Sequence, residues 1–305
     1  MLPLLLACAA PVVPTPPPAV QPLAASPAPA PVPTPAPEVY PAPARLVAIG
    51  DLHGDVPAGI LALRLAGLAD EAGHWTGGAA WLVQTGDVLD RGPQARTMFD
   101  WLRQIEREAE AAGGRALLLN GNHEVMNLHG DLRYVADLAD FPGTTQAEQT
   151  ASRAEYFSSG EGAAWVRTHP MTVQVGDTVF AHGGIDSRWA KHGIGGLNTL
   201  FRAALDDAEA LVLGPDGPLW NRTYLLGEPP VACAELTRAL EALNAKRMVL
   251  GHTTQDSGKI AERCQGRLYG IDTGISAHYG THPSALVIDR VGDLETVTML
   301  HAPSP

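Results

Sequence analysis

Five short apolar runs, separated by helix-like segments, constrain the fold of this chain more than any other feature. The runs span residues 46–49, 81–83, 116–119, 179–181 and 248–250. Each run is uncharged and apolar, which is typical of a short strand that is buried on both faces. Between the runs, apolar residues recur at spacings of three and four, as in a helix that follows Asp55 and one that ends at Gly113-Gly114. This alternation predicts an α/β fold in which sheets are flanked by helices.

Two regions depart from the alternation. Residues 268–300 are rich in strand-like runs without helices between them. Residues 125–170 look helical and irregular and contain five aromatic side chains. We expect this second segment to form a helical cap inserted into the domain.

Each of the five runs is followed by a polar motif that contains glycine. The motifs read Gly-Asp-Leu-His-Gly at 50–54, Gly-Asp-Val-Leu-Asp-Arg-Gly at 86–92, Gly-Asn-His-Glu at 121–124, His-Gly-Gly at 182–184 and Gly-His-Thr at 251–253. Loops at the carboxyl ends of strands converge on one crevice, so these groups can meet there. Asp51 alone would most often be a helix N-cap, and His182 alone a structural histidine, but the conjunction of five such motifs argues for a shared site. Carboxylate and imidazole donors suit Mn, Fe or Zn.

The order of these motifs resembles the calcineurin-like metallophosphoesterases, specifically the phosphoprotein phosphatase superfamily. The resemblance covers residues 46 to about 290. The motifs at 75–78, 219–222 and 249–253 are similar to the bacterial Shewanella-like phosphatase branch. Phosphatases that hydrolyse diadenosine tetraphosphate are less similar, because they usually lack an aspartate at the position of Asp90 and carry Asp where Glu124 stands. The resemblance implies a calcineurin-like β-sandwich flanked by helices, αββα in layers.

The resemblance also implies a site for two divalent cations, with Mn expected and Fe or Zn as alternatives. Asp51 and His53 would hold one cation, Asp87 would bridge both, and the other would be held by Asn122, His182 and His252. Two cations at such a site trap a bridging water, lower its pKa and aim it in line at phosphorus. Hydrolysis would then need no covalent enzyme intermediate.

The remaining expected site residues act on the substrate. His123 follows Asn122 and is the expected general acid, and Asp90 could hydrogen-bond its ring. Arg91 and Arg222, together with Asn122, are expected to bind the phosphate. Arg222 could instead be a surface arginine. Tyr279 lies in a segment that resembles the family's active-site loop and would stand at the cleft rim; an ordinary turn is the alternative.

The expected function is metal-dependent hydrolysis of phosphomonoesters, with a phosphorylated protein or peptide as substrate. A nucleotide or small-molecule phosphoesterase on the same scaffold is the nearer alternative, and a non-catalytic metal-binding envelope lipoprotein the remoter one. Nucleic acid is not an expected partner, because 21 basic against 33 acidic residues give a formal net charge of −12.

The N-terminus indicates export. Residues 1–8 resemble a lipoprotein signal, so Cys8 could carry a lipid anchor, the only membrane contact that we expect. Residues 9–44 are expected to be a disordered Pro/Ala-rich linker, since fifteen of the 26 prolines fall in residues 1–44. Residues 45–305 would then form the metallophosphoesterase domain of a periplasmic or membrane-anchored protein, or of a cytoplasmic one if residues 1–8 are not a signal.

Two further cysteines bear on the same question. Cys233 and Cys264 flank the helix and strand that lead to His252. In an exported protein they could form a disulfide, whereas in a cytosolic one they would be small core residues.

Overall fold

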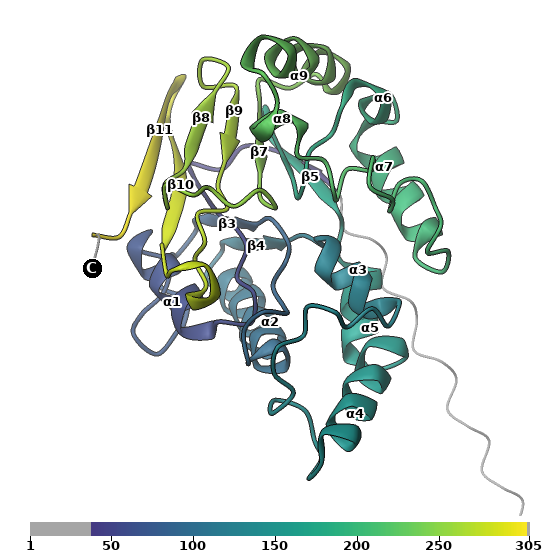
Figure 1. Cartoon of the computed structure of the whole chain (residues 1–305). Coiled ribbons are helices and arrows are strands. Elements are labelled where there is room, and N and C mark those ends of the chain that lie inside the picture. The colour runs from purple at the N-terminus through teal and green to yellow at the C-terminus, as the bar shows by residue number, and fades with distance from the viewer. Residues whose placement is uncertain (1–37, 304–305) are drawn as a thin grey trace, which may run out of the picture. The chain divides into compact units, whose positions relative to one another are not determined.

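The computed structural model describes residues 38–303, which form two facing β-sheets with helices on both outer sides (Figure 1). The five-stranded sheet consists, in spatial order, of β11 (Leu294–His301), β10 (Ser284–Val291), β2 (Arg45–Ile49), β3 (Trp81–Gln84) and β4 (Arg115–Leu118). The six-stranded sheet consists of β1 (Val39–Tyr40), β5 (Thr172–Val175), β6 (Thr178–Ala181), β7 (Arg247–Leu250), β9 (Leu268–Gly270) and β8 (Ala261–Arg263). The predicted signal on residues 1–8, Cys8 and most of the predicted linker lie outside the described residues.

The strand register explains why the apolar runs are continuous. In β2, Leu46 and Ala48 point into the core between the two sheets, whereas Val47 and Ile49 point outward onto the helices. Successive side chains of a strand alternate between its two faces, so a strand covered on both sides is apolar at most of its positions. β2 pairs in parallel with β3, and β3 with β4, so the motifs that follow them leave the sheet at the same edge.

The helices cover both outer faces and confirm the predicted αββα arrangement. They are α1 (Val56–Leu65), α2 (Ala95–Ala111), α3 (Asn122–Leu128), α4 (Gln146–Ser158), α5 (Glu161–Thr168), α6 (Ser187–Ala190), α7 (Gly193–Ala204), α8 (Thr223–Leu226) and α9 (Pro229–Leu243), with a 3₁₀ turn, η1 (Ala277–Tyr279). α1 and α2 pack on the five-stranded sheet, and α7 packs on β5 of the six-stranded sheet. Asp55 caps α1 by accepting a hydrogen bond from the Ala58 backbone N–H, as predicted.

The segment 125–170 contains most of α3 and all of α4 and α5, which pack on one another. Its aromatic side chains attach it to α2. The ring of Phe99 in α2 lies 4.7 Å from that of Trp165 and 5.8 Å from that of Phe157, measured between centroids. These contacts hold the cap beside the loops that follow β3 and β4.

The ordered domain begins earlier than residue 45, contrary to the expected linker boundary. Val39 and Tyr40 form β1 and pair in parallel with β5, and Tyr40 is buried. Glu38 also forms an ion pair with Arg202, with 2.7 Å between the charged atoms. The prolines on either side of this two-residue strand hid it, because proline removes the backbone donors that a longer ladder would need.

A disulfide joins Cys233 in α9 to Cys264 in the turn that follows β8, with 5.4 Å between their Cα atoms. Of the two outcomes that the sequence left open, the structure therefore has the disulfide. It ties a helix to a short hairpin at the edge of the six-stranded sheet.

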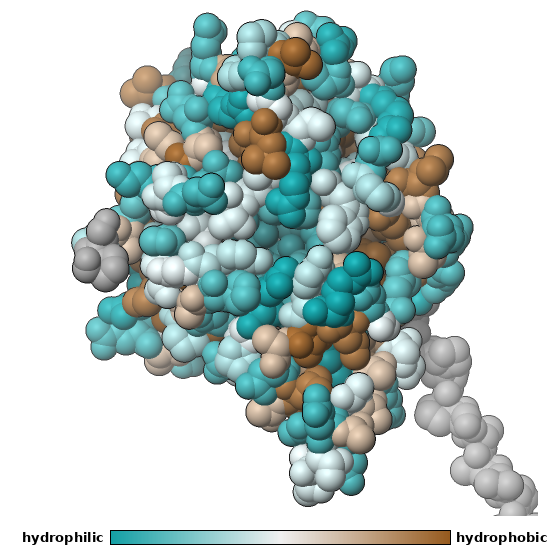
Figure 2. Space-filling view, viewed as in Figure 1, coloured by the Kyte–Doolittle hydropathy of each residue, from teal (hydrophilic) through white to brown (hydrophobic). Residues whose placement is uncertain are grey.

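The surface carries no extended apolar face on the side that Figure 2 shows, where hydrophobic residues form separate patches with hydrophilic residues between them. The most exposed large apolar side chains come from different elements: Leu211, Leu226, Val231, Val291 and Leu294. No helix within residues 38–303 is long and apolar enough to cross a membrane.

Candidate active site

A polar cavity of about 70 Å³ opens where the predicted motifs meet. Nine of the eleven predicted site residues line it: Asp51, His53, Asp87, Arg91, Asn122, His123, Arg222, His252 and Tyr279. The other two, Asp90 and His182, are buried behind this lining and contact it. Sequence reasoning missed three further lining residues, Tyr134, Trp220 and Thr254.

Tight backbone turns carry the motif side chains away from the strand ends. His53, Asp87 and His252 adopt the left-handed conformation, with φ of 47°, 53° and 65°. Strained non-glycine positions tend to cluster at active sites, and Asp90 and Arg91 of the Asp87 motif share this conformation. The neighbouring glycines make room for them: a Cβ on Gly121 would overlap the Asp87 carboxylate, and one on Gly251 would overlap the Asp51 carboxylate.

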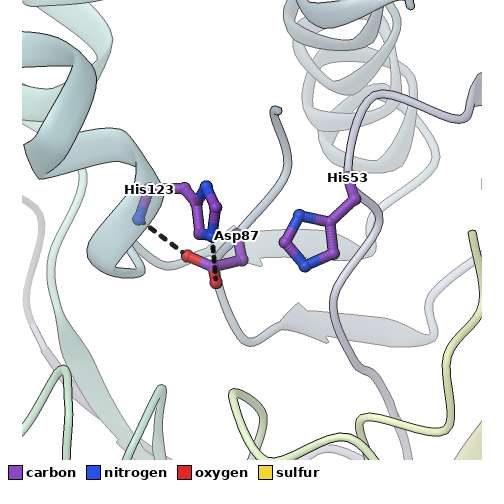
Figure 3. A group of neighbouring side chains, drawn as sticks. All are labelled: His53, Asp87 and His123. Carbon is purple, nitrogen blue, oxygen red and sulfur yellow. Dashed lines mark hydrogen bonds and ion pairs between the residues drawn. The ribbon is translucent and has the colours of Figure 1, made fainter. Parts of the chain in front are cut away.

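Two sets of metal-ligating atoms share Asp87. His53, Asp87 and His123 form one set, and Asp87, His182 and His252 form the other; in each set the atoms lie within 4.8 Å of one another. Oδ2 of Asp87 lies 3.8 Å from His123 Nε2 (Figure 3). The same oxygen lies 3.2 Å from His182 Nε2. Burial alone would raise the pKa of Asp87, but the imidazoles of His182, His123 and His53 outweigh burial and hold it well below the usual range.

The remaining predicted ligands adjoin these sets. Asn122 Oδ1 lies 3.0 Å from His182 Nε2. Asp51 Oδ2 lies 4.0 Å from His53 Nε2, and both carboxylate oxygens of Asp51 accept the backbone N–H of His252, at 3.2 and 3.1 Å. All six predicted ligands therefore converge, although Asp51 and Asn122 are not members of the two sets.

The donor chemistry fits divalent cations. His182 Nδ1 lies 2.8 Å from the carbonyl oxygen of Thr85, so in the neutral ring Nδ1 donates and Nε2 carries a lone pair. That lone pair faces the oxygens of Asn122 and Asp87, which are also hydrogen-bond acceptors. A cation bound between these three atoms would remove the repulsion among them. His252 Nε2 is also buried and has no hydrogen-bond partner within residues 38–303.

The pKa shifts agree with this fit. Burial lowers the pKa of His252 to about 2 and that of His53 to about 4, so both rings stay neutral and can ligate. Burial and the neighbouring carboxylates of Asp272 and Asp87 raise the pKa of Asp51 well above its usual range. A bound cation would compensate this excess of buried negative charge. Asp272, which sequence reasoning did not select, is therefore part of the charge balance of the site.

His123 differs from the other histidines. Its Nδ1 lies 2.7 Å from Asp90 Oδ2. Burial lowers its pKa, but the carboxylates of Asp87 and Asp90 outweigh burial and raise the pKa above the usual value. A ring that holds its proton cannot ligate a metal through that nitrogen.

Arginines and aromatic rings form the rest of the cavity. The guanidinium of Arg91 lies 4.0 Å from the centre of the Tyr134 ring, and Arg222 Nη1 donates to the carbonyl oxygen of His252 at 2.5 Å. Arg222 thus lines the cavity while its side chain remains exposed. Tyr279 lies in η1 with its ring 5.2 Å from that of His53, and the ring of Tyr134 lies 5.0 Å from that of His123.

Comparison with known proteins defines the class. The model of the calcineurin-like phosphoesterase family matches residues 44–256, and the chain belongs to that family. Shewanella-like protein phosphatase 2 of Arabidopsis thaliana is 34% identical over 305 residues, covering 84% of this chain and 78% of that protein. Shewanella-like protein phosphatase 1 of Plasmodium berghei is 32% identical over 261 residues, covering 80% and 72%.

Among solved structures, the cold-active protein-tyrosine phosphatase of a psychrophilic Shewanella species superposes with a TM-score of 0.73 at 27% identity, covering 87% of this chain and 83% of that one. The predicted family resemblance, the fold class and the assignment to phosphoester hydrolases are confirmed.

Proposed function

We propose that this protein is a metal-dependent protein phosphatase that acts on phosphotyrosyl residues. The observation that carries the proposal is the cavity itself, in which candidate metal ligands lie beside two arginines and two tyrosine rings. The names of the relatives from Arabidopsis thaliana and Plasmodium berghei, which call both of them protein phosphatases, support a phosphoprotein substrate. The similar Shewanella protein is named a protein-tyrosine phosphatase, which supports the choice of tyrosine.

The metal site would hold two divalent cations, with manganese proposed and iron or zinc as the other candidates for this oxygen and nitrogen donor set. The proposed ligands are Asp51 and His53 for one cation, Asn122, His182 and His252 for the other, and Asp87 for both. When bound, two such cations would activate a water and neutralise charge on the phosphate.

The protein's own residues would bind the phosphate and supply the proton. Arg91 Nε is buried without a hydrogen-bond partner among the described residues, and a phosphate oxygen in the cavity would satisfy it. Arg222 would bind from the opposite wall while its other nitrogen keeps the bond to the His252 carbonyl. His123 Nε2 faces the site and would donate its proton to the leaving oxygen, with Asp90 holding the ring from behind.

The aromatic walls favour a phenyl ring over the short side chains of serine and threonine. The phosphate group would lie in the cavity beside the candidate metal ligands and the two arginines. The bearing group would therefore lie at the rim, where Tyr134 and Tyr279 offer ring faces for stacking.

The test is one panel of phosphotyrosyl, phosphoseryl and phosphothreonyl peptides of the same sequence, assayed with manganese beside ATP and a dinucleotide. We expect kcat/KM on the phosphotyrosyl peptide to exceed the other two by about tenfold or more, since contacts with the two tyrosine rings contribute about 1 kcal/mol each and about 1.4 kcal/mol is tenfold. Faster turnover of ATP would favour the nucleotide phosphoesterase. No turnover of any substrate by metal-loaded protein would favour the non-catalytic lipoprotein.

We also propose that the protein is exported and anchored through Cys8. The disulfide between Cys233 and Cys264 supports this placement, because disulfides persist mainly in oxidising compartments.

A further inference from the structure

A buried arginine from the cap contacts the carboxylate that holds His123. Arg153 lies in α4, in the segment that no motif marks, and its side chain is only 1% exposed. Its Nη2 donates to Asp90 Oδ1 at 2.6 Å, while the other oxygen of the same carboxylate lies 2.7 Å from His123 Nδ1. One carboxylate thus connects the cap to the proposed proton donor.

Asn127 completes the network. Its amide nitrogen lies 2.9 Å from Asp90 Oδ2 and 3.1 Å from Asp90 Oδ1, and it donates to the backbone oxygen of His123 at 2.9 Å. Its amide oxygen accepts from Arg153 Nε at 2.9 Å. The Asp90 carboxylate is therefore held by three side chains, and its free rotation about the bond to Cβ is lost.

The cap fixes the position of Arg153 in turn. Its guanidinium lies 5.0 Å from the ring centre of Phe141 and 5.3 Å from that of Phe157. Within residues 38–303, Asp90 is the carboxylate with which this guanidinium forms an ion pair. A buried charge is costly unless it is paired, so the buried position of Arg153 is stable only when Asp90 pairs with it.

We infer that Arg153 is a positioning residue for phosphoester hydrolysis: through Asp90 it orients the His123 ring toward the leaving oxygen. This inference rests on the proposed role of His123 as proton donor. The cap would then contribute to the chemical step through Arg153, in addition to lining the cavity through Tyr134. The substrates that depend most on Arg153 are phosphoesters with a poor leaving group, because their leaving oxygen needs a proton most.

The test compares Arg153→Met with the parent enzyme, loaded with manganese, on phenyl phosphate and p-nitrophenyl phosphate. Partners of this kind, which orient a functional imidazole, typically contribute 10- to 100-fold, so kcat on phenyl phosphate should fall by about that factor. On p-nitrophenyl phosphate, whose leaving group hardly needs a proton, we expect a loss of only a few-fold, with KM nearly unchanged for both. Arg153→Lys should recover part of the loss, because an ammonium can pair with Asp90 but cannot also bind Asn127.

Arg103→Met is the matched control. Arg103 in α2 binds Glu161 of α5, with Nη1 2.8 Å from Oε2, so it attaches the cap without touching Asp90. We expect kcat on both substrates to stay within about twofold in this variant, as for surface ion pairs generally. An equal loss on both substrates in Arg153→Met, or a rise in KM alone, would overturn the inference. If Arg153→Met does not fold, the same comparison is made with Arg153→Lys.

His123→Asn separates this inference from the proposal beneath it. Its own loss should be about 10²- to 10⁴-fold on phenyl phosphate and much smaller on p-nitrophenyl phosphate. A leaving-group effect in His123→Asn without one in the Arg153 variants would overturn only the role of Arg153. The absence of a leaving-group effect in His123→Asn would overturn both.

Discussion

Asp87 is the carboxylate that both sets of candidate metal donors share. Its Oδ1 accepts the backbone N–H of His123 at 2.9 Å, and its Oδ2 faces His182 and His123. Its backbone is held in place by Glu124, whose carboxylate accepts the N–H groups of Asp87 and Val88 at 2.8 and 3.0 Å. The position of Asp87 is thus fixed by backbone contacts, while its side chain remains available to a cation.

At this position Asp87→Asn should remove activity while leaving a folded protein. The substitution keeps the size of the side chain but deletes the charge that offsets two cations, so we expect fewer than two metal ions per chain. Activity should fall by about 10³-fold or more, because the metal contribution is several kcal/mol. Metal content by elemental analysis and turnover of p-nitrophenyl phosphate measure both effects. Asp289→Asn, which breaks a surface pair with Arg45, should change neither.

Nine of the eleven predicted site residues lie in the glycine-containing motifs that follow strands, and the other two, Arg222 and Tyr279, were predicted from the family resemblance. Tyr134, Asn127 and Arg153 could not be found this way, because they come from a segment without such motifs. The sequence around Arg153 is polar and predicts a solvent-exposed helix face. Its burial depends on the tertiary contact with Asp90, which helical periodicity cannot reveal.

Among the elements, α1 and η1 are joined by one side chain. Oδ1 of Asp55 accepts the Ala58 N–H at 3.1 Å and caps α1, while Oδ2 accepts the Ala277 N–H at 2.8 Å. Ala277 begins η1, the turn that carries Tyr279. The start of the first helix therefore holds the aromatic rim of the cavity.

Asp55→Ser should separate these two contacts. A serine hydroxyl still caps the helix, so the free energy of unfolding should change by less than about 0.5 kcal/mol. The bond to Ala277 is lost, which should raise KM for a phosphotyrosyl peptide by about fivefold, corresponding to one hydrogen bond of about 1 kcal/mol. KM for a small alkyl phosphate, which does not reach the rim, should stay the same. Steady-state kinetics on both substrates measure the difference.

The matched control is Asp186→Ser, since Asp186 caps α6 in the same way and has no bond to the η1 turn. Its kinetics on both substrates should match those of the parent enzyme. An equal rise in KM on both substrates in Asp55→Ser would show instead that the phosphate site itself has been disturbed.

Elements were predictable where burial imposed a simple pattern. Five strands, β2, β3, β4, β6 and β7, are largely apolar because both of their faces are covered, and they were predicted within a residue or two of their observed bounds. β1 was missed because two paired residues between prolines carry no periodicity. The bond between Cys233 and Cys264 could not be decided, because sequence separation does not show whether a helix and a turn meet.

At the scale of the whole domain, the site depends on how the two sheets face each other. Asp51 and Asp87 follow strands of the five-stranded sheet, whereas His182 and His252 follow strands of the six-stranded sheet. The sequence indicated that these motifs converge, and the family resemblance implied two sheets, but neither showed which motif follows which sheet. The apolar core between the sheets determines how they pack together. No local sequence pattern shows which residues of one sheet contact which residues of the other.

An ion cluster joins the two sheets at one edge. Arg247 of β7, which is 1% exposed, pairs with Glu295 of β11 in the other sheet. Glu295 also pairs with Lys246 at 3.0 Å and with Arg290 of β10 at 2.5 Å. The cluster therefore fixes β11, an edge strand of the five-stranded sheet, relative to β7, an interior strand of the six-stranded sheet.

Glu295→Gln should destabilise the protein by about 2 kcal/mol, because it leaves the buried Arg247 without its carboxylate. Urea unfolding at pH 7, with both proteins loaded with manganese, measures the loss. The double variant Arg247→Met with Glu295→Leu should recover much of it, since both buried charges are then removed. A double variant as unstable as the single one would mean that the loss comes from packing.

The pH dependence of the stability lost in Glu295→Gln shows how much of that loss is electrostatic. Burial would raise the pKa of Glu295, but Arg247, Lys246 and Arg290 outweigh burial and hold it below the usual value near 4.5. A carboxylate whose pKa is lower in the folded state stabilises that state fully above its unfolded pKa, and the contribution disappears as the pH falls through the folded pKa. The difference in unfolding free energy between the parent protein and Glu295→Gln should therefore be constant from pH 7 to 5 and shrink below about pH 4.5. A difference that persists unchanged at pH 3 would show that Glu295 stabilises the sheets through its packing and not through its charge.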